Sequence, residues 1–181
     1  TPWLRTSVVK EETLLLPFNF KNWIDTNRHL LKPPVGNKMV YENSEFIIMV
    51  VGGPNTRKDY HIDEGEEFFY QLEGNMILRI MENGMPKDVG INEGDIFLLP
   101  PKVPHSPQRF ENTVGLVIER KRRDGELDGF QWYCDGCHTL LYEEFLPLTD
   151  IVKQLPPIFD GFWANNDARS CKACSAYLEK P

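Results

Sequence analysis

The hydrophobic positions near the start of the chain repeat with the period of a helix. The stretch NFKNWIDTNRHLL, residues 19–31, therefore predicts one helix. Asn19 is a suitable N-cap, because an asparagine side chain accepts a hydrogen bond from a free amide of the first turn. Pro33 and Pro34 should end the helix, since proline cannot continue it. Its apolar face is formed by Phe20, Trp23, Ile24 and Leu31.

From about residue 38 to 120 the pattern changes to short runs that are rich in branched and aromatic side chains. Turn-forming pairs such as Asn83-Gly84 and Pro100-Pro101 separate these runs. Regular spacing of this kind predicts a fold dominated by β-structure, an antiparallel sandwich or barrel. The runs are FIIMVV (46–51), EFFYQL (67–72), NMILRIM (75–81), DIFLLP (95–100) and VGLVIER (114–120).

Composition divides the chain into three parts. Residues 1–37 are expected to form an N-terminal arm and the helix, packed on a barrel of residues 38–120. Residues 121–181 contain a polar linker and a C-terminal region with all four cysteines. Within this last part, LTDIVKQL from Leu148 predicts a short helix.

Charge and hydropathy limit the partners. The net charge of −7 argues against attraction to nucleic acid or to an anionic membrane surface. The longest apolar stretches are too short to span a bilayer, and residues 14–16 are too few for a signal-peptide core. A cytoplasmic location is therefore expected.

The four cysteines form two Cys-x-x-Cys pairs, Cys134 with Cys137 and Cys171 with Cys174, separated by 33 residues. In a reducing compartment two such pairs predict a tetrahedral site of four thiolates. Two disulfides, or two unrelated redox pairs, are the alternatives. A tetrathiolate site leaves no open coordination position, so its zinc or iron would be structural, and the spacing does not choose between these metals. A zinc ribbon that binds nucleic acid is disfavoured by the acidic charge.

A carboxylate at the start of the second run also points to a metal. Strand side chains alternate between faces, so Glu67, Phe69 and Gln71 share one face of EEFFYQL. If this face is interior, Glu67 is costly to bury unless it is paired or binds a metal. His61, six residues earlier, can converge on the same ion.

A third ligand is expected from another strand. His105 follows an apolar strand and a proline-rich turn in GDIFLLPPKVPHSPQR, and it is the natural candidate. His29 lies on the predicted helix and His138 beside a cysteine, so neither position requires a role at this site. Two histidines and one carboxylate form the facial triad that is typical of non-haem Fe(II) oxygenases.

These residues resemble the two motifs of the cupin superfamily, a jelly-roll barrel. His61 and Glu67, with Gly74 seven places after Glu67, resemble the first motif, and Gly94, Pro100 and His105 resemble the second. The chain departs from both motifs. Asp63 stands where the first has its second histidine, Lys102 where the second has a glycine, and Arg109 where it ends in asparagine.

Longer stretches resemble one cupin family, the 3-hydroxyanthranilate 3,4-dioxygenases, in the bacterial and fungal form with a rubredoxin-like metal knuckle. The resemblance covers nearly all of the chain after about Pro17. It implies a homodimer that uses Fe(II) and O2 to open the ring of 3-hydroxyanthranilate. The product, 2-amino-3-carboxymuconate semialdehyde, cyclises to quinolinate, which feeds NAD biosynthesis from tryptophan by the kynurenine pathway. The stretches are LLKPPVGN, VVGGPN, DYH, EEFFYQLEGN, EGDIFLLPPKVPHSPQR, VIER and WYC.

The resemblance also assigns roles to residues around the iron. Arg57 and Arg109 match the pair that binds the substrate carboxylate, although exposed salt bridges would explain arginines equally well. Glu119 matches the residue that hydrogen-bonds the ring substituents and helps to move a proton; its alternative is a surface charge at a strand end. Asp59 is expected to hold an arginine or a metal ligand in place, and Asn37 matches a loop position near the substrate.

A second class of function remains open from the sequence, a non-catalytic cupin that binds a metal or ligand, or an isomerase on the same barrel. The fold alone does not decide, because this barrel supports many functions. The combination of Arg57, Arg109 and Glu119 around a three-ligand metal site favours the dioxygenase.

Overall fold

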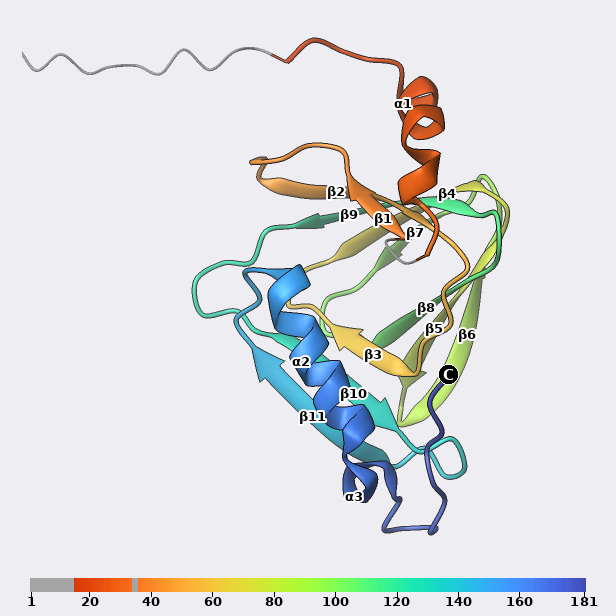
Figure 1. Cartoon of the computed structure of the whole chain (residues 1–181), viewed down its shortest axis with the longest axis vertical. Coiled ribbons are helices and arrows are strands. Elements are labelled where there is room, and N and C mark those ends of the chain that lie inside the picture. The colour runs from red at the N-terminus through yellow and green to blue at the C-terminus, as the bar shows by residue number, and fades with distance from the viewer. Residues whose placement is uncertain (1–14, 34–35) are drawn as a thin grey trace, which may run out of the picture.

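The computed structural model describes residues 15–33 and 36–181, and most of them form two antiparallel sheets and their connections (Figure 1). The predicted N-terminal arm over residues 1–14 lies outside the described residues, as does Pro34. None of the described helices is long and apolar enough to cross a membrane. The helices are α1 (Phe20–Asn27), the 3₁₀ helix η1 (Arg28–Leu30), α2 (Ile151–Ala164) and α3 (Asn166–Arg169). The strands are β1 (Asn37–Met39), β2 (Phe46–Gly52), β3 (Asp59–Ile62), β4 (Glu67–Glu73), β5 (Met76–Glu82), β6 (Met85–Ile91), β7 (Ile96–Leu99), β8 (His105–Arg109), β9 (Val114–Arg120), β10 (Asp128–Tyr133) and β11 (Leu140–Leu146).

The predicted sandwich or barrel is confirmed. One sheet has the strand order β1-β2-β9-β4-β7, and the other has the order β11-β10-β3-β8-β5-β6. Their facing side chains form the main core, to which Phe69 and Val117 contribute from the first sheet and Leu78 and Ile80 from the second. Burial alternates along β4, where Glu67, Phe69 and Gln71 are buried. The face that carries Glu67 is therefore the interior one, which is what makes its carboxylate costly.

The N-terminal helix follows the prediction in its cap and in its buried face. The Asn19 side chain accepts a hydrogen bond of 2.9 Å from the amide of Asn22. Ile24 and Leu31 are buried against Val50 of the five-stranded sheet. Figure 1 shows α1 lying over the outer side of this sheet. The helix thus covers one part of the sheet away from the main core.

The chain beyond residue 120 continues the six-stranded sheet, because β10 pairs with β3 and β11 pairs with β10. Phe130 and Trp132 of β10 pack against Ile158 and Phe162 of α2, and α2 runs alongside these strands in Figure 1. His61 shares this face of the sheet, since it is the Cα partner of Phe130. The C-terminal elements therefore build one wall around His61.

The helix predicted from Leu148 is present, but both of its bounds differ in the structure. The observed helix α2 begins after Asp150, whose side chain caps it by accepting a hydrogen bond of 3.1 Å from the Lys153 amide. It runs to Ala164 and contains both Pro156 and Pro157. Proline weakens a helix by removing a hydrogen bond, but the aromatic packing against β10 offsets this loss.

Candidate metal centre and its surroundings

Three strands bring His61, Glu67 and His105 together. His61 on β3 and His105 on β8 are Cα partners in the six-stranded sheet, and their ring centroids lie 5.1 Å apart. Glu67 begins β4 on the facing sheet. One possible ligand atom from each of these residues lies within 4.8 Å of the others. The structure therefore brings together the three residues that the sequence singles out.

The hydrogen bonds of His105 show that this cluster fits a cation. Its Nδ1 lies 3.0 Å from the carbonyl oxygen of Val103, to which it can donate a hydrogen bond. The other nitrogen of the neutral ring, Nε2, then presents a lone pair to Glu67 Oε2, 2.9 Å away. Among the described residues this buried oxygen has no hydrogen-bond partner. Two facing acceptors at this distance require a proton or a metal ion between them.

Charge in the cluster supports the same conclusion. Burial disfavours the charged form of His105, but the Glu67 carboxylate outweighs it and raises the pKa of the imidazole. Burial likewise opposes ionisation of Glu67, yet His105 and His61 together lower the pKa of this carboxyl. The site therefore favours an ionised Glu67 and draws positive charge toward it.

His61 is held by a carboxylate that the sequence interpretation did not identify. Its Nε2 lies 2.7 Å from Oδ2 of Asp128, which is fully buried on β10. With Nε2 engaged, Nδ1 is the nitrogen left for a metal ion. A carboxylate that fixes the ring of a metal-binding histidine is a common arrangement, and it also makes the imidazole a better ligand. Only the pairing of β10 with β3 reveals this contact, since 67 residues separate the two positions in the chain.

Glu119 lies directly beside Glu67. The two residues are Cα partners on β9 and β4, and Glu119 is only 5% exposed. Burial, and next the charge of Glu67, raise the pKa of Glu119 to about 8, while Arg122 opposes this rise. The side chain is therefore not the surface charge that a strand end would allow.

Arg109 is also buried, at 4% exposure, on β8. Its Nη1 donates one long hydrogen bond of 3.4 Å to Gln71 Oε1, and no carboxylate of the described residues pairs with it. Gly115 leaves room for it, because a Cβ there would lie 2.5 Å from Nη1. Burial lowers the pKa of Arg109 to about 10, against the opposing charge of Glu67. A buried guanidinium without a paired anion can bind one.

Four other residues that the sequence singles out are Arg57, Asp59, Asn37 and Asp63, and only some of them are buried. Arg57 pairs with Asp59 through Nε and Nη2, so the arginine that Asp59 contacts is Arg57. Asn37 is exposed at the start of the edge strand β1, where its Cα partner is Val51. Asp63, which stands in place of a cupin histidine, is buried and accepts a hydrogen bond of 2.9 Å from the Gly65 amide.

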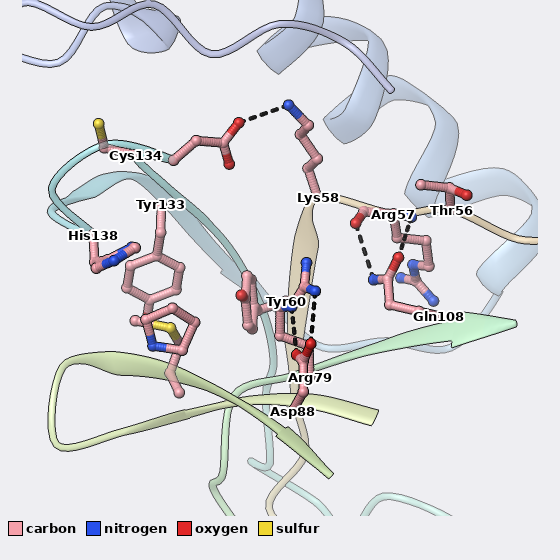
Figure 2. Close-up of a pocket in the computed structure, with 13 residues that line it drawn as sticks. Thr56, Arg57, Lys58, Tyr60, Arg79, Asp88, Gln108, Tyr133, Cys134 and His138 are labelled. Atoms are coloured by element: carbon pink, nitrogen blue, oxygen red, sulfur yellow. Dashed lines mark hydrogen bonds and ion pairs between the residues drawn. The ribbon is translucent and has the colours of Figure 1, made fainter. Parts of the chain in front are cut away.

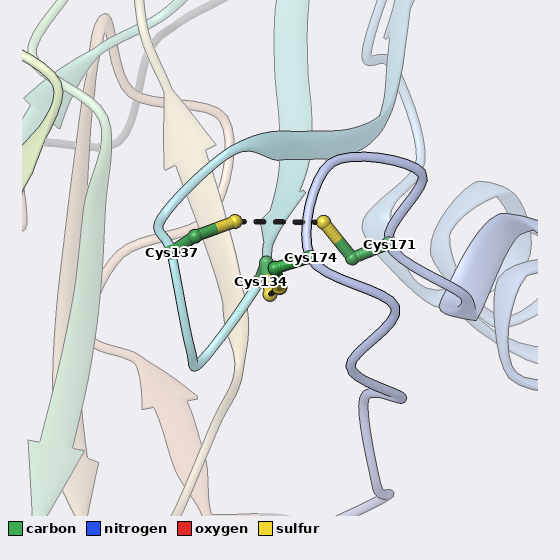
Figure 3. A group of neighbouring side chains, drawn as sticks. All are labelled: Cys134, Cys137, Cys171 and Cys174. Carbon is green, nitrogen blue, oxygen red and sulfur yellow. Dashed lines mark hydrogen bonds between the residues drawn. The ribbon is translucent and has the colours of Figure 1, made fainter.

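The four cysteines converge on one point, two from the turn after β10 and two from the turn after α3 (Figure 3). All four cysteines are free. The Sγ atoms of Cys134 and Cys174 lie 3.5 Å apart, and so do those of Cys137 and Cys171. These distances are far longer than a disulfide bond, so the disulfide alternative is wrong for this structure. Four sulfur atoms within 4.8 Å of one another form a candidate tetrathiolate site.

The two cysteine turns have the same backbone design. The carbonyl of Cys134 accepts a hydrogen bond of 2.9 Å from the His138 amide, and the carbonyl of Cys171 accepts one of 2.9 Å from the Ser175 amide. His138 and Ser175 both adopt positive φ, 61° and 63°. The position of His138 is therefore explained by the turn, which each pair needs in order to aim two sulfurs at one point.

Removing one of these thiolates should destabilise the C-terminal region and leave the histidine cluster intact. A structural metal contributes several kcal/mol to local folding, so Cys134→Ser should lose the second metal and lower the thermal stability. Calorimetry and metal analysis would measure both. Ala173→Ser, in an exposed position between two cysteines, is the matched control. Full stability together with a retained second metal would rule out the tetrathiolate site.

A cavity of about 500 Å³ lies near the cysteines, but none of the three candidate ligands lines it. Tyr60 lines it and is adjacent to His61 on β3, so the two side chains leave opposite faces of the sheet. Figure 2 shows Tyr60 and Tyr133 in this cavity, with the Arg79–Asp88 ion pair beside them. The cavity therefore lies on the opposite face of β3 from His61, and Arg57 is the predicted site residue that lines it.

Comparisons with known proteins place the sequence in a family. The sequence model of the family described as 3-hydroxyanthranilic acid dioxygenase matches residues 13–163. A relative from Xanthomonas euvesicatoria pv. vesicatoria, named 3-hydroxyanthranilate 3,4-dioxygenase, is 54% identical over 161 residues, which cover 89% of this chain and 91% of the relative. A relative of the same name from Jannaschia sp. is 56% identical over 161 residues, 88% of this chain and 89% of that protein.

Among solved structures, a cupin-2 domain containing protein from Shewanella frigidimarina is 16% identical, with a TM-score of 0.46, over 57% of this chain and 93% of that chain. The resemblance found in the sequence is confirmed by the family match, and the two antiparallel sheets form the predicted fold dominated by β-structure. With a match over residues 13–163 and relatives that are more than half identical, the chain belongs to the 3-hydroxyanthranilic acid dioxygenase family.

Proposed function

We propose that this chain is a ring-opening dioxygenase of 3-hydroxyanthranilate, in which His61, Glu67 and His105 hold Fe(II). The observation that carries the proposal is a buried Arg109 without a carboxylate partner among the described residues, close enough to Glu67 for its charge to act on the arginine. A cupin that only stores or binds a metal has no need for such a group. The substrate supplies the missing anion.

Iron in a site of two histidines and one carboxylate would bind substrate and dioxygen at its open positions and so allow electron transfer between them. Asp128 would keep the His61 ring in place, and the Val103 carbonyl would do the same for His105. These contacts fix the ligand set before substrate arrives, which avoids the cost of ordering it later.

Arg109 is proposed to bind the substrate carboxylate. A guanidinium offers parallel N–H donors that match both oxygens of a carboxylate, and burial strengthens this contact. Arg57 is proposed to assist from the segment just before β3, where Asp59 keeps its side chain oriented. Asn37 is proposed to contribute from the start of β1. Together these residues would orient the ring toward the metal.

Glu119 is proposed to accept the proton of the substrate's ring hydroxyl. Its burial beside Glu67, with a pKa raised to about 8, supports this role, since a group that titrates near neutral pH can take up and return a proton. Loss of that proton makes the ring electron-rich enough to react with dioxygen. Both oxygen atoms would enter the product, 2-amino-3-carboxymuconate semialdehyde, which cyclises to quinolinate for NAD biosynthesis.

The proposal extends to the other sites. The four cysteines would hold structural zinc or iron, because four thiolates leave no coordination position for a substrate. The homodimer that the family resemblance implies, and the cytoplasmic location expected from the hydropathy of the chain, are also part of it.

The direct test is anaerobic loading with Fe(II), followed by 3-hydroxyanthranilate and then air. We expect one equivalent of oxygen to be consumed per ring opened, measured with an oxygen electrode and by the absorbance of the product. Anthranilate, which lacks the ring hydroxyl, is the control and should not react. A protein that binds Fe(II) at this site but consumes no oxygen with the hydroxylated substrate would instead be a non-catalytic cupin.

A further inference from the structure

Three buried carboxylates surround a single arginine beside the metal centre. Arg122 Nη1 lies 3.1 Å from Glu119 Oε1, and Nη2 lies 3.3 Å from Asp63 Oδ2. Its Nε donates a hydrogen bond of 2.7 Å to Asp128 Oδ1, and Nη2 contacts the other oxygen of the same carboxylate. The side chain of Arg122 is itself only 10% exposed. One guanidinium therefore holds three carboxylates that come from different segments.

This group of four side chains is not the usual surface ion pair. The three carboxylates are between 0% and 5% exposed, so each would be costly to bury without a cation. Arg120, two residues earlier, does not pair with these carboxylates. Its guanidinium pairs with Glu126, which is partly exposed. Arg122 is therefore the cation that contacts all three carboxylates and holds them in place.

Two of the three carboxylates lead directly to the proposed chemistry. Asp128 holds His61 through the contact of 2.7 Å, and Glu119 lies beside Glu67 on the neighbouring strand. Asp63 anchors the arginine from a third side and is fixed in turn by the Gly65 amide. Arg122 thus contacts both the residue that orients a metal ligand and the residue proposed to move the substrate proton.

We propose that Arg122 is a positioning residue that sets the orientation of His61, through Asp128, and of Glu119 at the same time. The part that concerns Glu119 rests on the proposed function. Arginine is needed because its planar fork reaches three carboxylates in fixed directions, whereas a lysine ammonium is a point charge on a flexible stem. A lysine at this position keeps the charge but loses the geometry.

The test compares Arg122→Lys with its exposed neighbour, Arg123→Lys, as the matched control. Metal affinity of the histidine site is measured by competition with a chelator, which does not depend on activity. Arg122→Lys should weaken the affinity by about 10–100-fold, the effect typical of residues that orient metal ligands. In the metal-saturated enzyme it should lower kcat and leave KM for the substrate nearly unchanged, because Arg109 is untouched. Arg123→Lys should alter none of these values.

A double-mutant comparison asks whether Arg122 acts through Asp128. Asp128→Asn alone should also weaken metal affinity by about 10–100-fold. Combining it with Arg122→Lys should add little further loss, because both changes free the same imidazole ring, that of His61. Independent, fully additive losses would overturn the proposed route. If the lysine variant does not fold, Asp128→Asn carries the prediction alone, and parental affinity in that variant overturns the proposal.

The outcomes also separate this inference from the proposed function. A parent protein that binds Fe(II) tightly but opens no ring would contradict the proposed function. The affinity loss in Arg122→Lys would still support the route from Arg122 through Asp128 to His61. If the parent protein is fully active and Arg122→Lys keeps the parental metal affinity and kcat, only the positioning role of Arg122 is contradicted.

Discussion

Glu67→Ala should lose the metal of the histidine cluster and, with it, oxygen consumption. Glu67 is the only carboxylate of the three-residue cluster, and its buried Oε2 lacks a hydrogen-bond partner among the described residues. Changing a residue that only orients a metal ligand typically weakens metal affinity by about 10–100-fold. Removing the ligand itself should weaken the affinity by more than this. Metal analysis after dialysis, together with oxygen uptake, would measure the effect. His61→Ala and His105→Ala should behave in the same way.

Glu66→Ala is the matched control, because Glu66 is the same residue type, adjacent in the chain and exposed. It should keep both its metal and its activity. The four-cysteine site should keep its metal in every one of these variants, since it shares no residue with the cluster. Parental metal content in the histidine site of Glu67→Ala would remove Glu67 from the ligand set.

Arg109→Met should keep the metal but bind substrate poorly. Methionine fills much of the space of the arginine stem and removes the guanidinium. A lost charge-assisted contact costs about 2 kcal/mol or more, which corresponds to a rise of about thirtyfold in the apparent KM. Steady-state kinetics with 3-hydroxyanthranilate would measure this change. Arg79→Met, which breaks the partly exposed Arg79–Asp88 pair outside the barrel, is the control and should keep the parental KM.

A substrate without the carboxylate shows whether the effect is specific. 2-Aminophenol keeps the adjacent amino and hydroxyl groups but offers Arg109 no anion. The parent protein and Arg109→Met should therefore differ strongly with 3-hydroxyanthranilate and little with 2-aminophenol. An equal loss with both compounds would mean that the substitution disturbs the site as a whole and that Arg109 does not bind the carboxylate.

The metal ligands could be predicted from the sequence because the signals are local. Alternation in β4 puts Glu67 on the interior face, and the turn before β8 leads directly to His105. The strand β8 itself was not predicted, since HSPQR has little hydrophobic pattern and contains Pro107, which cannot donate a backbone hydrogen bond. Its pairing with β5 and β3 supplies what the local sequence lacks.

The residues around the ligands could not be predicted in the same way. The polar stretch from Arg120 to Gly129 has the composition of a linker, so nothing in it distinguishes Arg122 from the exposed Arg123. Their difference arises only when β10 folds back onto β3 and brings Asp128 to His61. Burial of a charged side chain by distant strands leaves no periodic signal in the chain.

The central claim is ring opening with both atoms of dioxygen at the site of His61, Glu67 and His105. The measurement that tests it most directly is the air-exposure experiment repeated with ¹⁸O₂, with the product reduced at once to prevent exchange of its aldehyde oxygen with water. Mass spectrometry of the trapped product should show two labelled oxygen atoms. Glu67→Ala should form no product. A product that carries one labelled atom or none, made by the iron-loaded parent protein, would contradict the account.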